Sequence, residues 1–234
     1  ELNAAAEKLQ AAGIIPFAHG GQAWQDATVF EAVAMGIGGN NYYKNCYVDL
    51  KESCLRSETT VKVFDQMRKL QGFTDEGSPG RDWNVATGMV IEGKAGFQIM
   101  GDWAKGEFTA AGKVPGVDYY CAATPSNNGY LYNVDSFIFY KSSDPDKQAG
   151  QKLLAKLMMG KNFQKVFNLY KGSIPARLDV SMDEFDKCAK TSNADIKTAG
   201  ASGGLVPSFA HGMAQGNTMK AALQDIITEH FNSD

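Results

Sequence analysis

The spacing of apolar residues predicts alternating helices and short strands at the start of the chain. Apolar residues recur at helical intervals over residues 1–12 and give that segment one apolar face. The run "IIPFA" at 14–18 is short and continuous, as expected of a buried strand, and "TVFEAVAMG" at 28–36 predicts the next helix. A helix–strand–helix unit of this kind is typical of the α/β class.

The same patterns predict the elements of the remaining chain. Helical spacing predicts helices at 58–71, 83–93, about 145–158, about 163–169, 181–191 and 208–231. Apolar runs predict strands at 95–100, 117–125 and 136–140. Segments rich in glycine and polar residues predict loops at 36–45, 75–82, 170–179 and 199–207.

Composition narrows the class of protein. The chain has 234 residues, of which 44% are apolar and 21% charged, with a net charge of −3. This length supports one large domain or two small ones. The charge gives no reason to expect nucleic acid or an anionic membrane surface as a partner. No apolar run approaches the roughly 18 residues that would span a bilayer. Because residues 1–12 already form an amphipathic helix, we expect no signal peptide, and therefore a mature product, a fragment or a cytosolic protein.

The four cysteines are Cys46, Cys54, Cys121 and Cys188, and their spacing matches no zinc site. Four buried thiols and one or two disulfides are both compatible with the sequence. If bridges form, Cys46–Cys54 with Cys121–Cys188 is the pairing to test first.

Candidate functional residues gather at the ends of predicted elements, where α/β sheets bind ligands. These residues are His19, Gln22, Trp24, Asp102, Trp103, Asn133, Asp135, Lys171 and His211. Aromatic faces match the C–H faces of a pyranose ring, and amide, carboxylate, ammonium and imidazole groups match its hydroxyls. The pattern therefore suggests a polar, neutral ligand held on aromatic platforms.

Each tryptophan also has a purely structural explanation. Trp103 could seal the end of the preceding strand against a helix. Trp24 could be a hydrophobic staple at a helix N-terminus, and Trp83 could pack as the first residue of its helix. The Gly101–Asp102 turn before Trp103 favours an exposed ring at that position.

The polar candidates have structural alternatives as well. Asn133 and Asp135 could form a turn before a strand, and Asp102 could cap the following helical turn. Lys171 could be a solvated lysine and His211 a local cap or packing residue. The sequence alone leaves these alternatives open.

Two other classes of protein account for part of this pattern. In an enzyme, Asp135, Lys171 and His211 could act as acid or base groups. However, the sequence has no G-x-S-x-G, no H-E-x-x-H and no metal cluster. A glycosidase needs two carboxylates flanking the bond, and Asp102 and Asp135 are the only candidates. A purely structural module would not explain polar and aromatic residues at element ends.

Several longer stretches resemble a known family. They are "AAAEKLQAAGIIPFAHGGQAWQDATVFEAVAMG", "GRDWNVATGMVIEGKAGFQIMGDWAKGEF", "NVDSFIFYKSS", "YKGSIPARLD" and "VPSFAHGMAQ". In this order they resemble the C-terminal part of the periplasmic sugar-binding proteins of ABC transporters, closest to the glucose/mannose-binding branch. The resemblance implies an α/β periplasmic-binding-protein fold of type II, similar to maltose-binding protein.

The resemblance also implies a domain organisation. Residues 1–132 would form the α/β core of the second lobe, 133–175 would cross to the first lobe, and 176–234 would return. A chain that opens at "ELNAAAEKL" would lack most of the first lobe. The sugar of this family is normally clamped between two lobes.

The family's sugar contacts transfer to individual positions of this chain. They are Trp24, Trp103, Asn133, Asp135, Lys171 and His211, with Gln22 and Trp83 as weaker matches. The resemblance implies a non-catalytic receptor for glucose or a similar hexose, with no cofactor and no metal. It further implies a periplasmic location, which favours disulfides, and docking of the closed form on a membrane permease.

Overall fold

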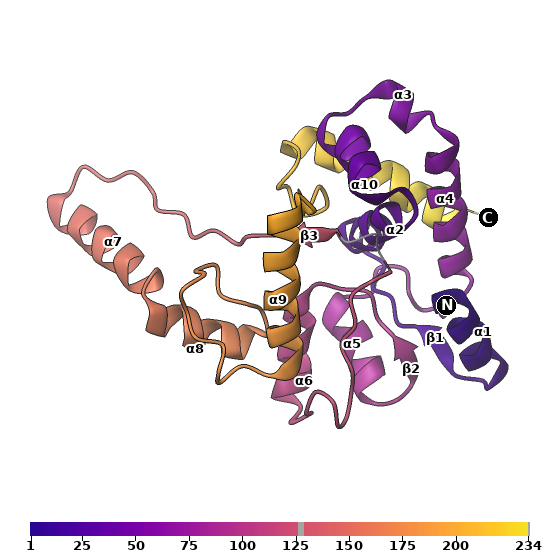
Figure 1. Ribbon diagram of the computed structural model, residues 1–234, viewed down its shortest axis with the longest axis horizontal. Helices are drawn as coiled ribbons and strands as arrows, with labels where there is room; N and C mark the ends of the chain where they lie inside the picture. Colours follow the sequence, from indigo (N-terminus) through magenta and orange to yellow (C-terminus); the bar gives the residue numbers. More distant parts are fainter. Residues whose placement is uncertain (126–128, 234) are drawn as a thin grey trace.

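A long helix, α2 (Ala23–Tyr43), lies at the centre of the molecule (Figure 1). The computed structural model describes residues 1–125 and 129–233. Helices α4 (Glu58–Gln71) and α10 (Asn217–Asn232) pack on α2 although they are far apart in sequence. The first half of α2 is buried on almost every side, and its buried residues include the polar side chains of Gln25, Asp26 and Glu31.

An aromatic cluster fixes how these helices meet. The ring of Phe30 on α2 lies 5.6 Å from that of Tyr47, 5.0 Å from Phe64 and 6.2 Å from Phe209, measured between centroids. These rings come from four separate segments of the chain, so their burial holds the N-terminal and C-terminal parts of the fold together.

The other elements surround this core in chain order. They are α1 (Leu2–Ala11), β1 (Ile15–Phe17), the π-helix η1 (Lys44–Val48), α3 (Glu52–Leu55), α5 (Trp83–Ile91), β2 (Ala95–Phe97), the 3₁₀ helix η2 (Asp102–Ala104), α6 (Lys105–Ala110), β3 (Tyr130–Tyr132), α7 (Pro145–Met158), α8 (Lys161–Lys171), α9 (Lys187–Ser202) and β4 (Leu205–Pro207). The predicted helices at 1–12, 58–71, 83–93 and 145–158 are confirmed to within a few residues.

The strands form two short parallel pairs in the described part of the chain. Ile15 of β1 pairs with Ala95 of β2, and Tyr130 of β3 pairs with Leu205 of β4. Parallel pairing brings the carboxyl ends of two strands to the same edge. The residues that follow β1 and β2, and those that follow β3 and β4, are therefore neighbours.

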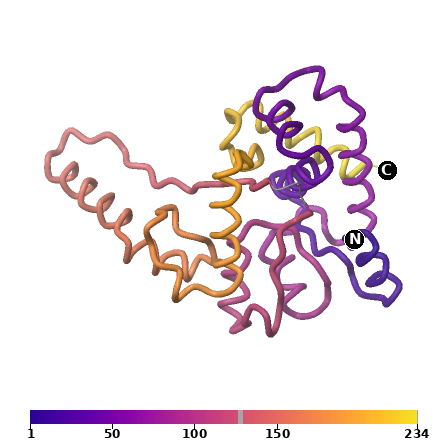
Figure 2. The backbone as a smooth tube through the Cα atoms, in the orientation of Figure 1, coloured from indigo at the N-terminus to yellow at the C-terminus, as the bar shows by residue number. Residues whose placement is uncertain are grey.

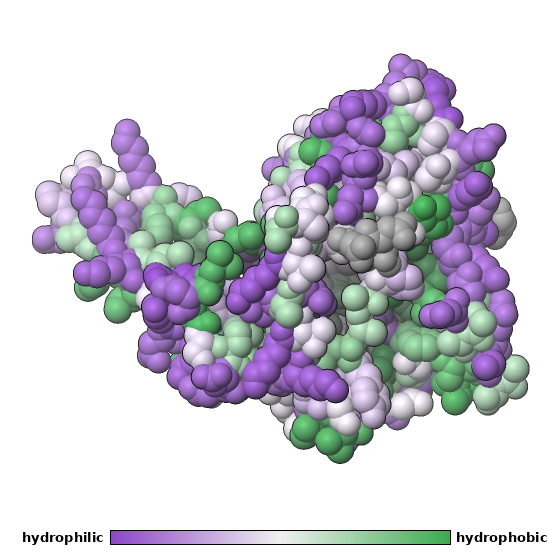
Figure 3. All heavy atoms as spheres, in the orientation of Figure 1, coloured by the Kyte–Doolittle hydropathy of each residue, from purple (hydrophilic) through white to green (hydrophobic). Residues whose placement is uncertain are grey.

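After β3 the chain leaves the body as an extended arm, residues 133–175, which comprises an extended segment, α7 and α8 (Figure 2). No residue of α7 is fully buried. Figure 3 shows apolar side chains gathered on this arm. Its exposed apolar residues are Val134, Phe137, Ile138, Phe139, Tyr140, Leu153, Leu154, Leu157, Met159, Val166, Phe167 and Tyr170.

Both disulfides of the proposed pairing are present. Cys46 in η1 is joined to Cys54 in α3, and Cys121 is joined to Cys188 in α9. The first bridge closes a local loop. The second crosses 67 residues of sequence and ties the segment before β3 to the helix that follows the arm.

The predicted loop at 36–45 is wrong, because helical turns lie on both sides of a single non-helical residue, Gly39. α2 extends to Tyr43 with a kink at Gly39, where φ is 74°, and η1 follows directly. Glycine is a poor helix former, but Tyr42 and Tyr43 are buried in the core. The packing of these two rings outweighs the local preference of the glycines.

Two predicted strands are also wrong. Residues 117–125 are irregular, and the chain turns there through a hydrogen bond from the Gly116 N–H to the Tyr119 carbonyl. Residues 136–140 are extended, but no described residue pairs with them as a strand. Apolar runs form strands only where another strand supplies hydrogen bonds. The strand in this region is β3, at Tyr130–Tyr132, which the pattern of apolar residues did not predict.

The C-terminal elements are shifted relative to their prediction. α9 begins at Lys187 rather than near 181 and runs into the predicted loop at 199–207, of which the last part is β4. The final helix begins at Asn217 rather than 208. Residues 208–216 form a turn in which Gly212 has a φ of 74°, and this turn holds one of the candidate residues. No helix in the described ranges has the length and apolar character needed to cross a membrane.

Candidate functional site

An open cavity of about 530 Å³ lies where the ends of several elements meet. Its walls come from the start of α5, the η2–α6 segment, the chain just after β3, the end of α8 and the turn after β4. The lining residues are Trp83, Trp103, Gly106, Glu107, Asn133, Asp135, Tyr170, Lys171 and His211. The position beyond the carboxyl ends of β2, β3 and β4 is where α/β folds usually bind ligands.

His211 lies against two tryptophan rings on one wall of the cavity. The centroid of its imidazole is 5.1 Å from that of Trp103 and 6.0 Å from that of Trp24, both in edge-on geometry. Both tryptophans are partly exposed, unlike the fully buried aromatic rings of the core. The three rings together present an apolar surface, and the buried Nε2 of His211 has no hydrogen-bond partner among the described residues.

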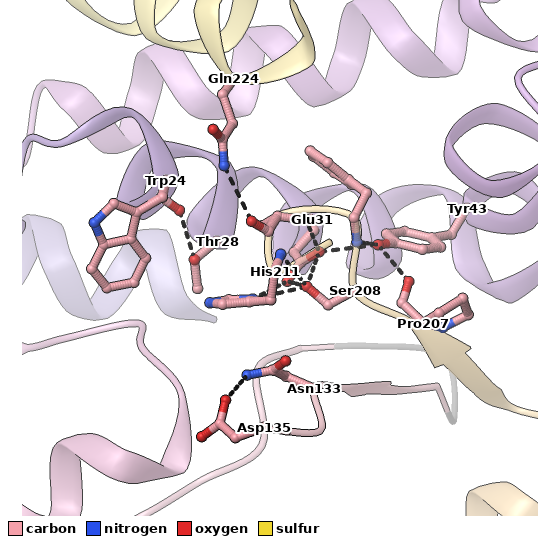
Figure 4. Close-up of polar contacts among 12 residues, drawn as sticks. Trp24, Thr28, Glu31, Tyr43, Asn133, Asp135, Pro207, Ser208, His211 and Gln224 are labelled. Carbon is pink, nitrogen blue, oxygen red and sulfur yellow. Dashed lines mark hydrogen bonds and ion pairs between the residues drawn. The ribbon is translucent and has the colours of Figure 1, made fainter. Parts of the chain in front are cut away.

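A series of buried hydrogen bonds fixes the orientation of the His211 ring (Figure 4). Its Nδ1 lies 2.8 Å from Ser208 Oγ, and Ser208 Oγ lies 2.7 Å from Glu31 Oε1. Glu31 also accepts a hydrogen bond from the hydroxyl of Tyr43, at 3.0 Å. Burial, and next the neighbouring Glu31 carboxylate, raise the pKa of Tyr43 well above its usual value, so this phenol keeps its proton and donates it.

Gln22 fixes the orientation of Trp24. Its Oε1 accepts from the indole N–H of Trp24 at 2.8 Å, and its Nε2 donates to Asp82 Oδ1 at 2.6 Å. Asp82 is the residue immediately before Trp83, at the start of α5. Gln22 therefore connects the N-terminus of α2 to the N-terminus of α5 and does not itself line the cavity.

Asn133, Asp135 and Lys171 form the wall opposite His211 (Figure 4 shows the first two). The Lys171 ammonium forms an ion pair with the Asp135 carboxylate, and the amide of Asn133 donates to Asp135 Oδ1 at 3.3 Å. The hydrogen bond from Lys171 holds the pKa of Asp135 below its usual value. Asp135 is therefore an ionised acceptor at neutral pH.

The end of α8 is held tightly against α6, which positions Lys171. A Cβ atom on Gly106 would lie 2.9 Å from the Lys171 carbonyl oxygen, and one on Gly172 would lie 2.6 Å from the Gly106 nitrogen. Gly172 also has a φ of 88°, which strongly favours glycine. Ser173 then donates to Asp102 Oδ1 at 2.8 Å. Asp102 thus accepts from the segment that follows α8 rather than capping its own turn, and burial raises its pKa.

The structure brings most of the predicted site residues together. Six of them line the cavity, namely Trp83, Trp103, Asn133, Asp135, Lys171 and His211. Trp24 contacts His211, and Gln22 contacts Trp24. His19 lies elsewhere, buried in the core, with its Nε2 2.7 Å from Asp26 Oδ1.

Sequence reasoning missed two lining side chains, Glu107 and Tyr170. Glu107 follows Trp103 by four residues, a spacing that places side chains on the same face of a helical segment. Tyr170 directly precedes Lys171 in the stretch "YKGSIP". The helical spacing of Glu107 from Trp103 and the position of Tyr170 next to Lys171 could therefore both have been recognised in the sequence. Among the described residues there is no cluster of three or more histidine, cysteine, aspartate or glutamate side chains suited to a metal ion.

Comparison with family models gives the class of protein. Residues 1–158 match the family described as bacterial extracellular solute-binding protein. The match covers more than half of the chain, and the chain belongs to this family. The expectation of a binding protein rather than an enzyme agrees with this membership.

Relatives with curated descriptions match almost the whole chain. A "probable sugar-binding periplasmic protein" of Brucella suis is 47% identical over 99% of this chain and 55% of its own length. A protein of the same description from Rhizobium meliloti is 45% identical over 100% of this chain and 56% of its own length. An uncharacterised ABC transporter extracellular-binding protein of Pyrococcus horikoshii is 33% identical over 98% of this chain and 51% of its own length. The chain spans about half the length of the curated relatives that it matches.

Solved structures confirm the fold. A chitin oligosaccharide binding protein superposes with a TM-score of 0.73 and 18% identity over 97% of this chain and 57% of its own. A Streptococcus pneumoniae solute-binding protein, solved with a blood group A-trisaccharide, superposes with a TM-score of 0.67 and 19% identity. The match covers 100% of this chain and 59% of that protein's own chain. The predicted α/β fold of the periplasmic binding proteins is therefore confirmed.

Proposed function

We propose that this chain supplies one wall of a monosaccharide site in a periplasmic sugar-binding protein of an ABC importer, with glucose or a similar hexose as the ligand. The observation that supports this most directly is the cavity itself. Partly exposed tryptophan rings and a set of fixed hydrogen-bonding groups face the same space. The names of the Brucella and Rhizobium relatives support a sugar as the ligand and the periplasm as the location.

Each side chain has a role that follows from its chemistry. Trp24 and Trp103 offer apolar faces to the C–H surface of the sugar ring. Asp135 accepts hydrogen bonds from hydroxyls, and Asn133 and Lys171 donate to hydroxyl oxygens. Charged groups form the stronger hydrogen bonds, at about 1.5–3 kcal/mol each. We therefore assign most of the discrimination between sugars to Asp135 and Lys171.

Gln22 and Trp83 have supporting roles in this proposal. Gln22 holds the indole of Trp24 in place through the hydrogen bond at its N–H. Trp83 borders the cavity at the start of α5. His211 completes the ring of polar groups between the two platforms.

We further propose that residues 133–175 cross to a first lobe, while 1–132 and 176–234 belong to the second. The apolar side chains exposed on the arm support this division, since such a surface normally packs against another part of a protein. The greater length of the relatives supports it too, because a polypeptide of similar size to this one remains in each of them. Closure of two lobes would cover the sugar, and the closed form would dock on the permease.

A glycosidase is the rival function, and the cavity contains two carboxylates, on Glu107 and Asp135. A glycosidase needs one carboxyl group with a raised pKa as its general acid. Asp102 has a raised pKa, but it accepts from Ser173 and does not line the cavity, and the hydrogen bond from Lys171 lowers the pKa of Asp135. This favours binding over hydrolysis.

A thermal-shift screen with monosaccharides tests the proposal. A hexose that binds the folded protein should raise its melting temperature in a concentration-dependent manner, while pentoses and sugar acids should not. The screen should include a longer protein that carries both lobes. Turnover of an aryl glycoside, or the absence of any sugar response in the two-lobed protein, would contradict the proposal.

A further inference from the structure

The hydrogen bonds between Glu31, Ser208 and His211 determine which nitrogen of the His211 ring carries a proton. Glu31 and Ser208 are almost fully buried, at 3% and 2% exposure. The Glu31 carboxylate accepts from three donors, namely the hydroxyls of Tyr43 and Ser208 and the Ala210 N–H at 3.3 Å, and His211 Nδ1 lies 3.6 Å from its Oε1. The single proton of the Ser208 hydroxyl is therefore directed at Glu31.

Ser208 must then accept from His211. A hydroxyl has one proton and two acceptor positions. The backbone N–H of His211 donates to Ser208 Oγ at 3.1 Å and occupies one of these positions. Nδ1 of His211 lies 2.8 Å from Ser208 Oγ, at the second acceptor position of the hydroxyl. With the hydroxyl proton already committed to Glu31, a hydrogen bond at this distance requires a proton on Nδ1.

We propose that Glu31 and Ser208 are positioning residues that hold His211 in its Nδ1–H tautomer, so that Nε2 presents a lone pair to the sugar site and selects a ligand hydroxyl that donates. A neutral imidazole with its proton on Nδ1 is an acceptor at Nε2. Nε2 has no partner among the described residues and is shielded from solvent. A ligand group without a proton would leave it unpaired, which is costly in a buried site. This last step rests on the proposed sugar function.

The other two histidines of the chain provide internal controls. Nε2 of His19 lies 2.7 Å from Asp26 Oδ1, and Nε2 of His230 lies 3.0 Å from the carbonyl oxygen of Phe64. Both partners are acceptors, so both rings carry a proton on Nε2. Since the chain has three histidines, His211 should be the one neutral ring with its proton on Nδ1.

Imidazole ¹H–¹⁵N correlation spectra of the ¹⁵N-labelled protein test the tautomer without any ligand. They are recorded at mildly alkaline pH, where an ordinary imidazole is neutral. The expected result is the Nδ1–H pattern for His211 and Nε2–H for His19 and His230. An Nε2–H pattern for His211 overturns the proposal, and the wild-type spectrum decides this whether or not any variant folds.

Glu31→Gln tests the role of the carboxylate. The amide of glutamine can donate to Ser208 Oγ, which frees the hydroxyl proton for Nδ1 and moves the ring proton of His211 to Nε2. Ser208→Thr retains the hydroxyl and should retain the wild-type tautomer. The spectra of His19 and His230 should not change. A folded Glu31→Gln protein that keeps the Nδ1–H form contradicts the positioning role.

A panel of deoxyfluoro-glucoses, measured on the two-lobed protein, tests the link to the ligand. Fluorine takes the place of a hydroxyl but cannot donate. The analogue fluorinated at the position that faces Nε2 should lose about tenfold or more in affinity, and Glu31→Gln should reduce that loss. Equal losses in wild type and variant overturn the acceptor role. If glucose itself does not bind, the proposed function fails, while the tautomer result stands on the ligand-free spectra.

Discussion

Lys171 donates a hydrogen bond to the carboxylate of Asp135 and so joins the end of helix α8 to the segment that leaves β3. The two residues are 36 positions apart and lie at opposite ends of the arm. Their ion pair closes the base of the arm at the edge of the cavity. It also fixes the charge of Asp135, which we propose as the principal acceptor for ligand hydroxyls.

Replacement of Asp135 by alanine should therefore weaken hexose binding strongly. Loss of a charged acceptor, with Lys171 left unpaired, should cost about 1.5–3 kcal/mol, or roughly ten- to more than a hundredfold in affinity. Lys141→Ala, at an exposed position on the same arm, is the matched control and should bind as wild type. Titration calorimetry on a protein with both lobes measures the difference. Identical curves for the two variants would remove Asp135 from the site.

Gly101→Ala should disturb the site without a change in any polar group. An alanine Cβ at this position would lie 2.1–2.4 Å from ring atoms of Trp103, so the indole must move. We expect weaker sugar binding and an altered tryptophan fluorescence spectrum. The φ of Gly101 is −67°, which alanine adopts readily, so the backbone adds no strain of its own.

Gly88→Ala is the control for that substitution. Gly88 lies inside α5, and nothing lies within 4 Å of an added Cβ. Alanine is a better helix former by about 1 kcal/mol, so this variant should be at least as stable as wild type, with unchanged fluorescence. A Gly101→Ala protein that matches it in sugar affinity would argue against stacking at Trp103.

Asp102→Asn should stabilise the fold at neutral pH. Burial is the main cause of the raised pKa of Asp102, partly offset by Ser173 and by the charges of Lys171 and Lys105. Because the folded state holds this proton more tightly, its contribution to stability is complete below the ordinary carboxyl pKa and is lost as the pH rises through the raised value. Asparagine removes the buried charge and can still accept from Ser173.

Thermal melting across a range of pH measures this effect. The melting temperature of Asp102→Asn should exceed that of wild type at neutral pH, and the difference should disappear below a pH of about 4. Asp118→Asn is the control, since Asp118 is exposed and also accepts from a backbone N–H, that of Val114. An increase in melting temperature that is the same at all pH values would show that removal of the buried charge is not its cause.

Removal of the two disulfides should have unequal costs. Loop-closure entropy predicts a loss of about 4 kcal/mol for the bridge between Cys121 and Cys188, and of about 2–3 kcal/mol for that between Cys46 and Cys54. The comparison uses paired Cys→Ser variants and urea unfolding. A larger loss for the short loop would indicate that packing around η1, rather than chain entropy, dominates.

The sequence predicted elements well where a local signal and the tertiary structure agree. Helix α4 has an apolar face, and the side chain of Ser57 caps it by accepting from the Thr60 N–H. The predicted bounds of 58–71 match the structure. The loop predicted at 36–45 failed because burial of distant tyrosine rings, which no local pattern reports, keeps that segment helical.

The candidate site shows the same limit. The ends of predicted elements pointed to Trp103, Asn133, Lys171 and His211, and the family resemblance pointed to the same residues. Nothing in the sequence connects Glu31 with Ser208, which are 177 positions apart and meet only in the folded chain. Side chains that contact a ligand can be proposed from motifs, whereas the residues that orient them depend on three-dimensional packing.

The bridge between Cys121 and Cys188 also changes the connectivity of the molecule. It closes a covalent ring that contains β3 and the whole arm, including α7 and α8. A protease that cuts once within the exposed arm would open this ring without releasing a fragment. The two pieces would stay joined until the bridge is reduced, so the most exposed part of the chain is protected against loss by a bond at its base.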